Sequence, residues 1–168
     1  MDFIRPREDY IESYRDAILE DLMYRAHGER LFADPDRVVE LAKQFEEGNF
    51  LPEGYVKQTT FWLVEDGRFL GEIGVRHALT PALLQYGGNI GYEVRYSEWG
   101  KGYGTKMLSL ALAYCKEVLK LDKVLITCDD DNYASARVIE KNGGVLENKV
   151  INHLERGTVT TRRYFITL

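Results

Sequence analysis

Cysteine is scarce in this sequence, with Cys115 and Cys128 the only two among 168 residues. Two cysteines do not make the disulfide framework of a small secreted domain, and each lies in an apolar run, which favours buried, reduced thiols. No apolar stretch reaches the ~18 residues of a membrane helix, and the first residues mix charged and apolar side chains instead of forming a signal-peptide core. We therefore expect a cytoplasmic protein with no membrane partner.

Positive charge is scarce as well, because 22 Lys and Arg stand against 27 Asp and Glu, giving a net charge of −5. Without a Lys/Arg cluster, a general nucleic-acid partner is not expected. The sequence also lacks internal repeats, low-complexity tracts and Ser/Pro-rich linkers. With 45% hydrophobic residues it can fill one sizeable core. These features predict a single domain over residues 1–168.

The first part of the chain has helical patterns. Apolar residues at three-to-four spacing predict a helix from Asp9 to Met23. Asp34-Pro35 has the form of an N-cap followed by a first-turn proline, and predicts a second helix that ends at Gly48. From Thr60 onward strands dominate, beginning with a hairpin around Asp66-Gly67.

The remaining elements alternate between strands and helices. After a connection over residues 80–88, apolar and polar residues alternate in a strand from Asn89 to Arg95, which puts Ile90, Tyr92 and Val94 on one face and Glu93 on the other. The expected elements after it are a helix over 107–119, a strand over 123–128, a helix over 132–141, and strands over 145–151 and 162–168. This order predicts an α/β (α+β) fold with a mixed, mostly antiparallel sheet flanked by helices.

The segment from Gly91 to Lys106, GYEVRYSEWGKGYGTK, joins a strand to a helix through alternating glycines. Glycines let the backbone approach a ligand closely, and the start of a helix presents unpaired N–H groups to an anion. A phosphate or pyrophosphate site is expected here, with Lys101 and Lys106 adding charge. The Gly-Lys-Ser/Thr ending of a Walker loop is missing, and Thr105 replaces the third glycine of a dinucleotide fingerprint. A turn that only tightens the corner remains an alternative.

This segment resembles the acyl-CoA-binding motif of the GNAT superfamily of N-acyltransferases, Gln/Arg-x-x-Gly-x-Gly/Ala, with Gly102 and Gly104 at its two small positions. Further on, the strand KVLITC leads to Asn132-x-x-Ser135 and then RVIEKNGG, which is similar to the second motif of that family. The resemblance covers roughly residues 60 to 151. Within the superfamily the sequence most resembles a little-characterised bacterial branch of expected acetyltransferases.

The resemblance implies that acetyl-CoA is the acyl-donor substrate, that no metal takes part, and that the donor lies between the strands at Asn89–Arg95 and Lys123–Cys128. It implies that backbone groups from Tyr92 to Val94 pair with the pantetheine arm. The residues implied in binding the donor are Tyr92, Val94, Trp99, Gly100, Lys101, Gly102, Tyr103, Gly104, Thr105, Asn132 and Ser135. Trp99 departs from the usual Gln or Arg, and Ile139 replaces a tyrosine that serves as general acid in many members.

The implied reaction is direct attack of an amine on the thioester, so neither cysteine is needed as a nucleophile. Glu93 is the preferred general base, and His77 is the second candidate because of its ordinary pKa. We expect an N-acetyltransferase for a primary amine of a small molecule or peptide. A non-catalytic acyl-CoA-binding module or sensor is the alternative, and a nucleotide-binding oxidoreductase is a third one. Dimerisation through a sheet edge is also expected.

Overall fold

A computed structural model describes residues 1–24, 33–155 and 157–168. These residues contain one sheet of seven strands in the order β1-β2-β3-β4-β5-β7-β6. Neighbouring strands are antiparallel, except for the parallel pair β4 and β5. The expected mixed, mostly antiparallel sheet is confirmed. The strands are β1 (Asp2–Ile4), β2 (Gln58–Glu65), β3 (Arg68–Arg76), β4 (Ile90–Val94), β5 (Lys123–Asp129), β6 (Val145–Leu154) and β7 (Gly157–Thr167).

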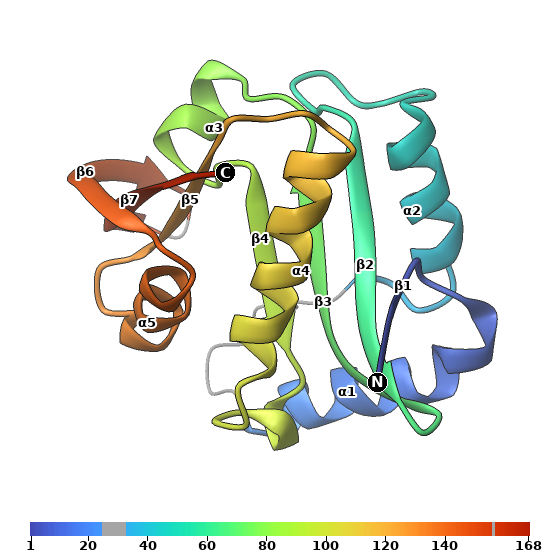
Figure 1. Cartoon of the computed structure of the whole chain (residues 1–168). Coiled ribbons are helices and arrows are strands. Elements are labelled where there is room, and N and C mark those ends of the chain that lie inside the picture. The colour runs from blue at the N-terminus through green and yellow to red at the C-terminus, as the bar shows by residue number, and fades with distance from the viewer. Residues whose placement is uncertain (25–32, 156) are drawn as a thin grey trace.

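Helices cover both faces of this sheet (Figure 1). The helices are α1 (Ile11–Tyr24), α2 (Val38–Glu47), α3 (Pro81–Gln85), α4 (Tyr103–Glu117) and α5 (Tyr133–Lys141), with short 3-10 turns at η1 (Glu8–Tyr10) and η2 (Tyr96–Glu98). One buried cluster joins α4 and α5 to residues such as Ile73 and Ile90. The other joins α1 and α2 to Trp62 and Phe69 on the opposite face. The sheet therefore has an α4/α5 face and an α1/α2 face.

The alternation in β4 assigns its side chains to these two faces as expected. Ile90 is buried in the cluster under α4, and Tyr92 and Val94 pack against the same cluster. Arg95, just beyond the strand, instead reaches the Ser13 hydroxyl on α1. Glu93 has the same parity as Arg95, so it lies on the α1/α2 face.

Turn and cap residues in the sequence correctly predicted where several elements end. Asp66 and Gly67 both have positive φ, 49° and 76°, as expected for a tight hairpin turn. Gly48 ends α2 in the left-handed conformation. The start of this helix was placed wrongly, because the Asp34 carboxylate accepts a hydrogen bond from the Asp36 N–H in a preceding turn and α2 begins only at Val38.

Two elements were missed by the sequence analysis. The edge strand β1 has only three residues, too few to show a period, and is held by pairing with β2. The connection over residues 80–88 contains α3, which is five residues long and capped by the Thr80 hydroxyl accepting from the Leu83 N–H. Both are too short for a hydrophobic pattern to reveal.

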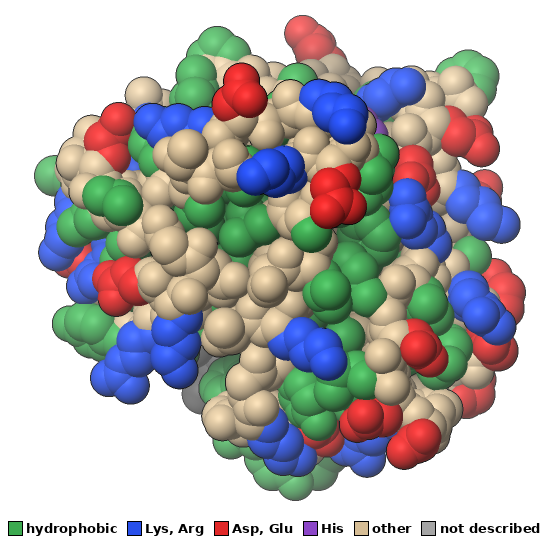
Figure 2. Space-filling model, viewed as in Figure 1, with side chains coloured by type: hydrophobic (Ala, Val, Ile, Leu, Met, Phe, Trp, Pro, Cys, Tyr) green, Lys and Arg blue, Asp and Glu red, His purple; other side chains and the backbone are tan. Residues whose placement is uncertain are grey.

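Charged side chains of both signs are interspersed over the face that carries α4 and α5 (Figure 2). The total charge of that face therefore does not single out an anion site, and the local backbone has to be considered. Within the described part of the chain, no helix combines the length and apolar character needed to cross a membrane.

Candidate active site

β4 and β5 separate soon after they meet. Their strand pairing is at one position, Ile90 with Ile126. Beside it, the Asn89 N–H donates to the Leu125 carbonyl at 2.7 Å, and the Leu125 N–H donates to Asn89 Oδ1 at 2.9 Å. No further β4–β5 pairing is present among the described residues. Two parallel strands that are joined at one end only leave an opening between them.

The register with β3 determines which backbone groups of β4 point into this opening. Hydrogen bonds from Arg76 N–H to the Asn89 carbonyl (2.7 Å) and from Arg95 N–H to the Leu70 carbonyl (2.9 Å) show that the odd-numbered positions bond to β3. In an antiparallel ladder the intervening residues turn their N–H and C=O groups the other way. The backbone groups of Tyr92 and Val94 therefore point toward β5.

Val94 already uses both of its backbone groups within the chain. Its N–H donates to Glu93 Oε1 at 3.2 Å, and its carbonyl accepts from Trp99 Nε1 at 2.8 Å. The expectation that Val94 binds a ligand through these groups conflicts with this arrangement. Tyr92 is thus the better placed of the two residues to present its backbone to a ligand in the opening.

The glycine-rich turn leads directly into the N-terminus of α4. Gly100 and Gly102 have φ of 76° and 89°, and a Cβ on either would meet no atom within 4 Å. No side chain among the described residues caps the helix, and its first turn closes with the Lys106 N–H donating to the Gly102 carbonyl at 3.1 Å. The N–H groups of the residues between them have no partner within the helix. This end of α4 therefore offers backbone donors beside open space, which suits a phosphate.

Gly104 and Thr105 have a different environment. Gly104 is buried, and a Cβ there would lie 3.4 Å from Val138 Cγ2 and 3.6 Å from Val94 Cγ2. The Thr105 carbonyl accepts a hydrogen bond from Asn142 Nδ2 at 3.2 Å. The small residue at 104 thus lets α4 pack closely against α5 and β4, and both residues can meet a ligand mainly through their N–H groups.

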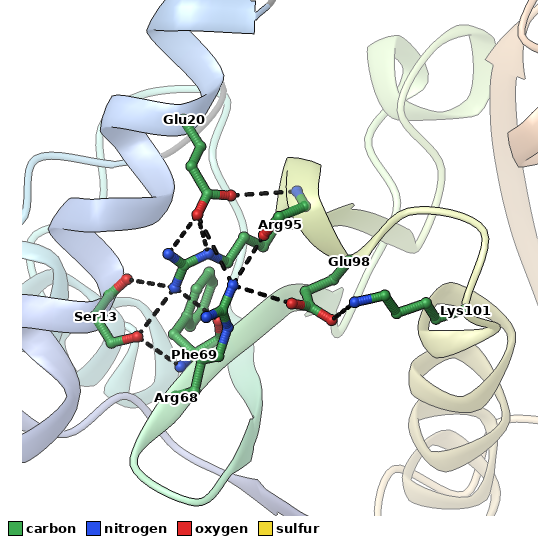
Figure 3. A network of polar contacts seen from close by, with 8 residues as sticks. Ser13, Glu20, Arg68, Phe69, Arg95, Glu98 and Lys101 are labelled. Carbon is green, nitrogen blue, oxygen red and sulfur yellow. Dashed lines mark hydrogen bonds and ion pairs between the residues drawn. The ribbon is translucent and has the colours of Figure 1, made fainter.

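A network of charged residues attaches the end of β4, and the first residues of the turn that follows it, to helix α1 (Figure 3). The buried Arg95 donates from Nε to Glu20 Oε1 at 2.8 Å and from Nη1 to Ser13 Oγ at 3.1 Å. Burial disfavours ionised Glu20, but hydrogen bonds from Arg95 and Ser97 outweigh it and lower the pKa of Glu20. Glu98 pairs with Arg68 and with Lys101, whose Nζ lies 2.9 Å from Glu98 Oε2. The Lys101 charge is therefore already paired.

Residues from the second sequence motif lie on the other side of the opening. Asn132 caps α5, with its Oδ1 accepting from the Ser135 N–H at 3.0 Å. The Ser135 hydroxyl lies 2.9 Å from the Tyr92 hydroxyl, so β4 and α5 are joined across the opening. Burial raises the pKa of Tyr92 to about 12, which keeps its phenol protonated near neutral pH. The structure thus brings Tyr92, Asn132 and Ser135 together.

Glu93 lies opposite a second carboxylate that the sequence analysis missed. Glu72 on β3 is its direct cross-strand partner, and Glu72 Oε2 accepts a hydrogen bond from Trp62 Nε1 at 3.1 Å. Burial raises the pKa of Glu72 to about 7, the Trp62 hydrogen bond opposes this rise, and the nearby Glu93 charge adds to it. A half-buried carboxyl that titrates near neutral pH is a common feature of catalytic sites.

The fold does not place His77 next to Glu93. It lies five residues beyond Glu72 along the chain, a distance of roughly 16 Å in an extended strand. Its Nε2 lies 2.9 Å from Thr59 Oγ1, which is also 3.1 Å from the Tyr114 hydroxyl of α4. Burial lowers the pKa of His77, although Glu46 opposes the shift. His77 therefore belongs to a hydrogen-bond network at the other end of β3.

A cavity of about 370 Å³ lies near β4, between α2, α3 and the end of β3. Arg76 lines it and donates from Nη1 to the carbonyls of Gly87 and Gly88, at 3.1 and 3.0 Å. A Cβ on Gly91 would meet the Arg76 guanidinium at 3.9 Å, so the cavity reaches within two residues of Glu93. The other lining residues are Phe45, Gly54, Tyr55, Val56, Gln58, Thr80, Ala82, Leu83 and Tyr86.

Comparison with known proteins gave one family and a consistent fold. The family model for an acetyltransferase (GNAT) domain matches residues 5–145. A ribosomal L7/L12 alpha-N-protein acetyltransferase in complex with coenzyme A has a TM-score of 0.72 at 17% identity, covering 99% of this chain and 93% of that one. The ribosomal-protein-S5-alanine acetyltransferase of Vibrio fischeri has a TM-score of 0.73 at 12% identity, covering 98% and 91%. A spermidine N-acetyltransferase variant of Vibrio cholerae has a TM-score of 0.66 at 14% identity, covering 99% and 95%.

Proposed function

The chain belongs to the GNAT acetyltransferase family and is an acetyl-CoA-dependent N-acetyltransferase; from this premise we propose that it acetylates a primary amine of a small molecule or peptide by direct attack. The observation that carries the proposal is the opening between β4 and β5, which lies next to the uncapped N-terminus of α4. Two of the similar structures are named for acting on a protein α-amine and on spermidine, which supports an amine acceptor.

The donor side of the site uses backbone groups more than side chains. In our proposal the N–H groups from Tyr103 to Thr105 bind the pyrophosphate, and Gly100 and Gly102 leave room for it. The Tyr92 backbone pairs with the pantetheine arm in the opening. Asn132 and Ser135 border the arm from α5.

The acceptor approaches from the α1/α2 face, where Glu93 and the cavity lined by Arg76 lie. An ammonium group has a pKa near ~10, so it must lose a proton before its nitrogen can attack. Glu93 is our candidate for the group that accepts this proton, directly or through one water. The amine nitrogen then bonds to the thioester carbon, the C–S bond breaks, and CoA leaves as the thiolate. The position of the usual acid is filled by the buried Ile139, so no protein group is assigned to protonate the thiolate.

A covalent acetyl-cysteine is not part of this mechanism. Cys115 and Cys128 are both buried, and burial raises the pKa of each thiol to about 11. Both therefore stay protonated near neutral pH, and a thiol is a far weaker nucleophile than a thiolate.

The test is a matched pair of variants at Gly102, because that position has φ of 89° and open space around it. Asp and Asn both tolerate the left-handed conformation and have nearly the same shape, so Gly102→Asp differs from Gly102→Asn chiefly in charge. Calorimetry should show CoA binding at least ~10-fold weaker for the Asp variant than for the Asn variant, because a carboxylate would face the pyrophosphate. Equal affinities would contradict the assigned phosphate site.

Turnover is measured by thiol release from acetyl-CoA with a panel of primary amines. The wild-type protein should release CoA in the presence of at least one amine and yield the N-acetyl product by mass spectrometry. Tight CoA binding with no product from any amine would support the non-catalytic module instead.

A further inference from the structure

The cavity between α2, α3 and the end of β3 has a cation and no acid among the lining residues that the structure describes. The cation is Arg76, whose side chain is half-buried. Its Nη1 donates to the carbonyls of Gly87 and Gly88, at 3.1 and 3.0 Å. These bonds use only one nitrogen of the guanidinium, which carries N–H donors on all of its nitrogens.

The other two nitrogens of Arg76, Nε and Nη2, make no hydrogen bond within the part of the chain that the structure describes. Their N–H groups lie side by side on one edge of the planar guanidinium, which can bind both oxygens of a carboxylate at once. Arg7 uses this edge in the same chain, because it donates to the Asp9 carboxylate from Nε at 3.0 Å and from Nη2 at 2.6 Å. Arg76 therefore has the same edge available for a carboxylate from outside the chain.

No carboxylate among the described residues neutralises Arg76. Burial lowers the pKa of Arg76, and no described acid opposes this shift. Arg95, a buried arginine on the same face of the sheet, is instead paired with Glu20. A guanidinium stays charged in proteins, and a partly buried charge without a counter-charge is costly. An anionic ligand in the cavity would offset this cost.

The Arg76 guanidinium lies beside the opening between β4 and β5. The Arg76 N–H donates to the carbonyl of Asn89, the residue that also bonds to Leu125 of β5. Gly91 is exposed, and a Cβ there would lie 3.9 Å from Arg76 Nη2, with no other described residue except its chain neighbours within 4 Å. Tyr92, whose backbone faces the opening, follows Gly91 directly, and consecutive Cα atoms are ~3.8 Å apart. A group bound to Arg76 is therefore only a few bonds from the site of the thioester.

The remaining lining of the cavity is largely apolar. The rings of Phe45 and Tyr55 meet edge-on with centroids 5.7 Å apart, and α3 contributes Leu83. Among the polar lining residues, Gln58 already donates from Nε2 to Thr60 Oγ1 at 3.3 Å. Small-molecule sites typically have volumes of ~300–1,000 Å³, apolar walls and a few polar groups that fix orientation. The cavity thus fits a small molecule with an apolar part and one carboxylate.

We propose that the acceptor is an amino acid with an apolar side chain, whose carboxylate binds Nε and Nη2 of Arg76 and whose side chain contacts Phe45 and Tyr55. This inference rests on the proposed acetyl transfer and narrows its acceptor. The carboxylate holds the substrate on the α1/α2 face, and the α-amine beside it reaches the thioester in the opening. The first residue of a peptide has an amide in place of this carboxylate, so a free amino acid is the better match.

The experiment measures by calorimetry how the CoA complex of the protein binds N-acetyl-L-phenylalanine and N-acetyl-L-phenylalaninamide. The two probes differ in a carboxylate against an amide, and neither has an amine that could titrate. The wild-type protein should bind the acid at least ~10-fold more tightly, because the amide lacks the charge-assisted pair of hydrogen bonds. Arg76→Gln should bind both probes with affinities within about threefold of each other.

Arg7→Gln is the matched control, because Arg7 pairs with Asp9 and is not among the described lining residues of the cavity. It should keep the wild-type preference for the acid. Arg76→Lys keeps the positive charge but loses the planar edge with two donors, so its preference should lie between those of the wild-type protein and Arg76→Gln.

Turnover of leucine, phenylalanine and their amides is the second measurement. The ratio of kcat/KM for each acid to kcat/KM for its amide is compared between variants, so that the different pKa values of the amines cancel. This ratio should fall at least ~10-fold from the wild-type protein to Arg76→Gln.

The wild-type measurements decide the matter even if the Arg76 variants fold poorly. Equal affinity for the two probes, tighter binding of the amide, or no binding of either would overturn the proposal. A preference for the acid that Arg76→Gln retains would overturn it as well. A wild-type protein that acetylates other amines but no apolar amino acid would contradict this acceptor and leave the proposed acetyl transfer intact. Failure to acetylate any amine would instead contradict the proposed function.

Discussion

Glu72→Gln should stabilise the protein at alkaline pH, because the ionised Glu72 is in an unfavourable place. Gln keeps the shape of the side chain and an oxygen that can accept the Trp62 hydrogen bond. It removes the negative charge that lies opposite Glu93.

The size of the stabilisation expected for Glu72→Gln follows from the shift in the pKa of Glu72. Burial, with the Glu93 charge in addition, raises the pKa of Glu72 from 4.5 to about 7. In full, such a shift corresponds to about 3 kcal/mol, since one pKa unit is ~1.4 kcal/mol. Solvent reaches this half-buried side chain and screens the charge, so we expect ~1–2 kcal/mol.

The sign of the stability change depends on where the pH lies relative to the pKa of Glu72 in the unfolded chain and in the folded protein. Below pH 4.5 the carboxyl is protonated in both the folded and the unfolded chain. Between there and pH 7 it is protonated only in the folded protein, so the contribution of Glu72 to the free energy of unfolding falls as the pH rises. Above that window the group is ionised in both states and the full penalty remains.

Urea denaturation of the wild-type protein, Glu72→Gln and Glu147→Gln at about pH 5 and about pH 8 measures the effect, with Glu147→Gln as the control because this carboxylate on β6 pairs with Arg163. The stability difference between Glu72→Gln and the wild-type protein should grow in favour of the variant by ~1–2 kcal/mol between these pH values. The control should show no such change. An equal difference at both pH values would refute the raised pKa of Glu72.

Two further outcomes are expected. The double variant Cys115→Ala, Cys128→Ala should retain turnover and show no acetyl-enzyme by mass spectrometry, with some stability lost to cavities; an acetyl group trapped on either sulfur of the parent would contradict direct attack. Arg95→Met should lower the free energy of unfolding by ~3 kcal/mol in urea titrations, because it removes the buried guanidinium that binds Glu20 and Ser13 and leaves Glu20 only the more distant Arg68, and Glu20→Gln in the same chain should recover part of the loss.

Local signals in the sequence were sufficient where a short pattern fixes the backbone. Asp66-Gly67 fixes the hairpin, and the alternation in β4 places Tyr92 and Glu93 on opposite faces. The glycine turn and the Asn132 cap both lie where the sequence predicts them. These features involve neighbours along the chain, whose geometry depends on the dihedral preferences of a few residues.

The placement of Glu72 between Trp62 and Glu93 depends on long-range strand register, which local sequence patterns do not reveal. A bulge between Leu63 and Val64 shifts the pairing of β2 with β3, so counting back from the hairpin turn does not bring Glu72 opposite Trp62. The pairing of β3 with β4 is set across a connection that contains α3. A slip of one residue would have turned Glu72 to the other face. His77 is the opposite case. Its residue type alone made it a candidate general base, although it lies at the far end of β3 from Glu93.

Trp99 gives a last test, because the structure uses its indole differently from the expected role in donor binding. Its N–H donates to the Val94 carbonyl, and its ring packs against Tyr96 with centroids 4.9 Å apart. Trp99→Phe keeps a ring but removes the hydrogen bond, which should cost ~1 kcal/mol of stability. The freed Val94 carbonyl can then accept a bond from a pantetheine amide, so CoA affinity measured by calorimetry should stay within about threefold of the parent, or increase. A loss of tenfold or more would show that the indole binds the donor itself, and the assignment of its N–H to the fold would be wrong.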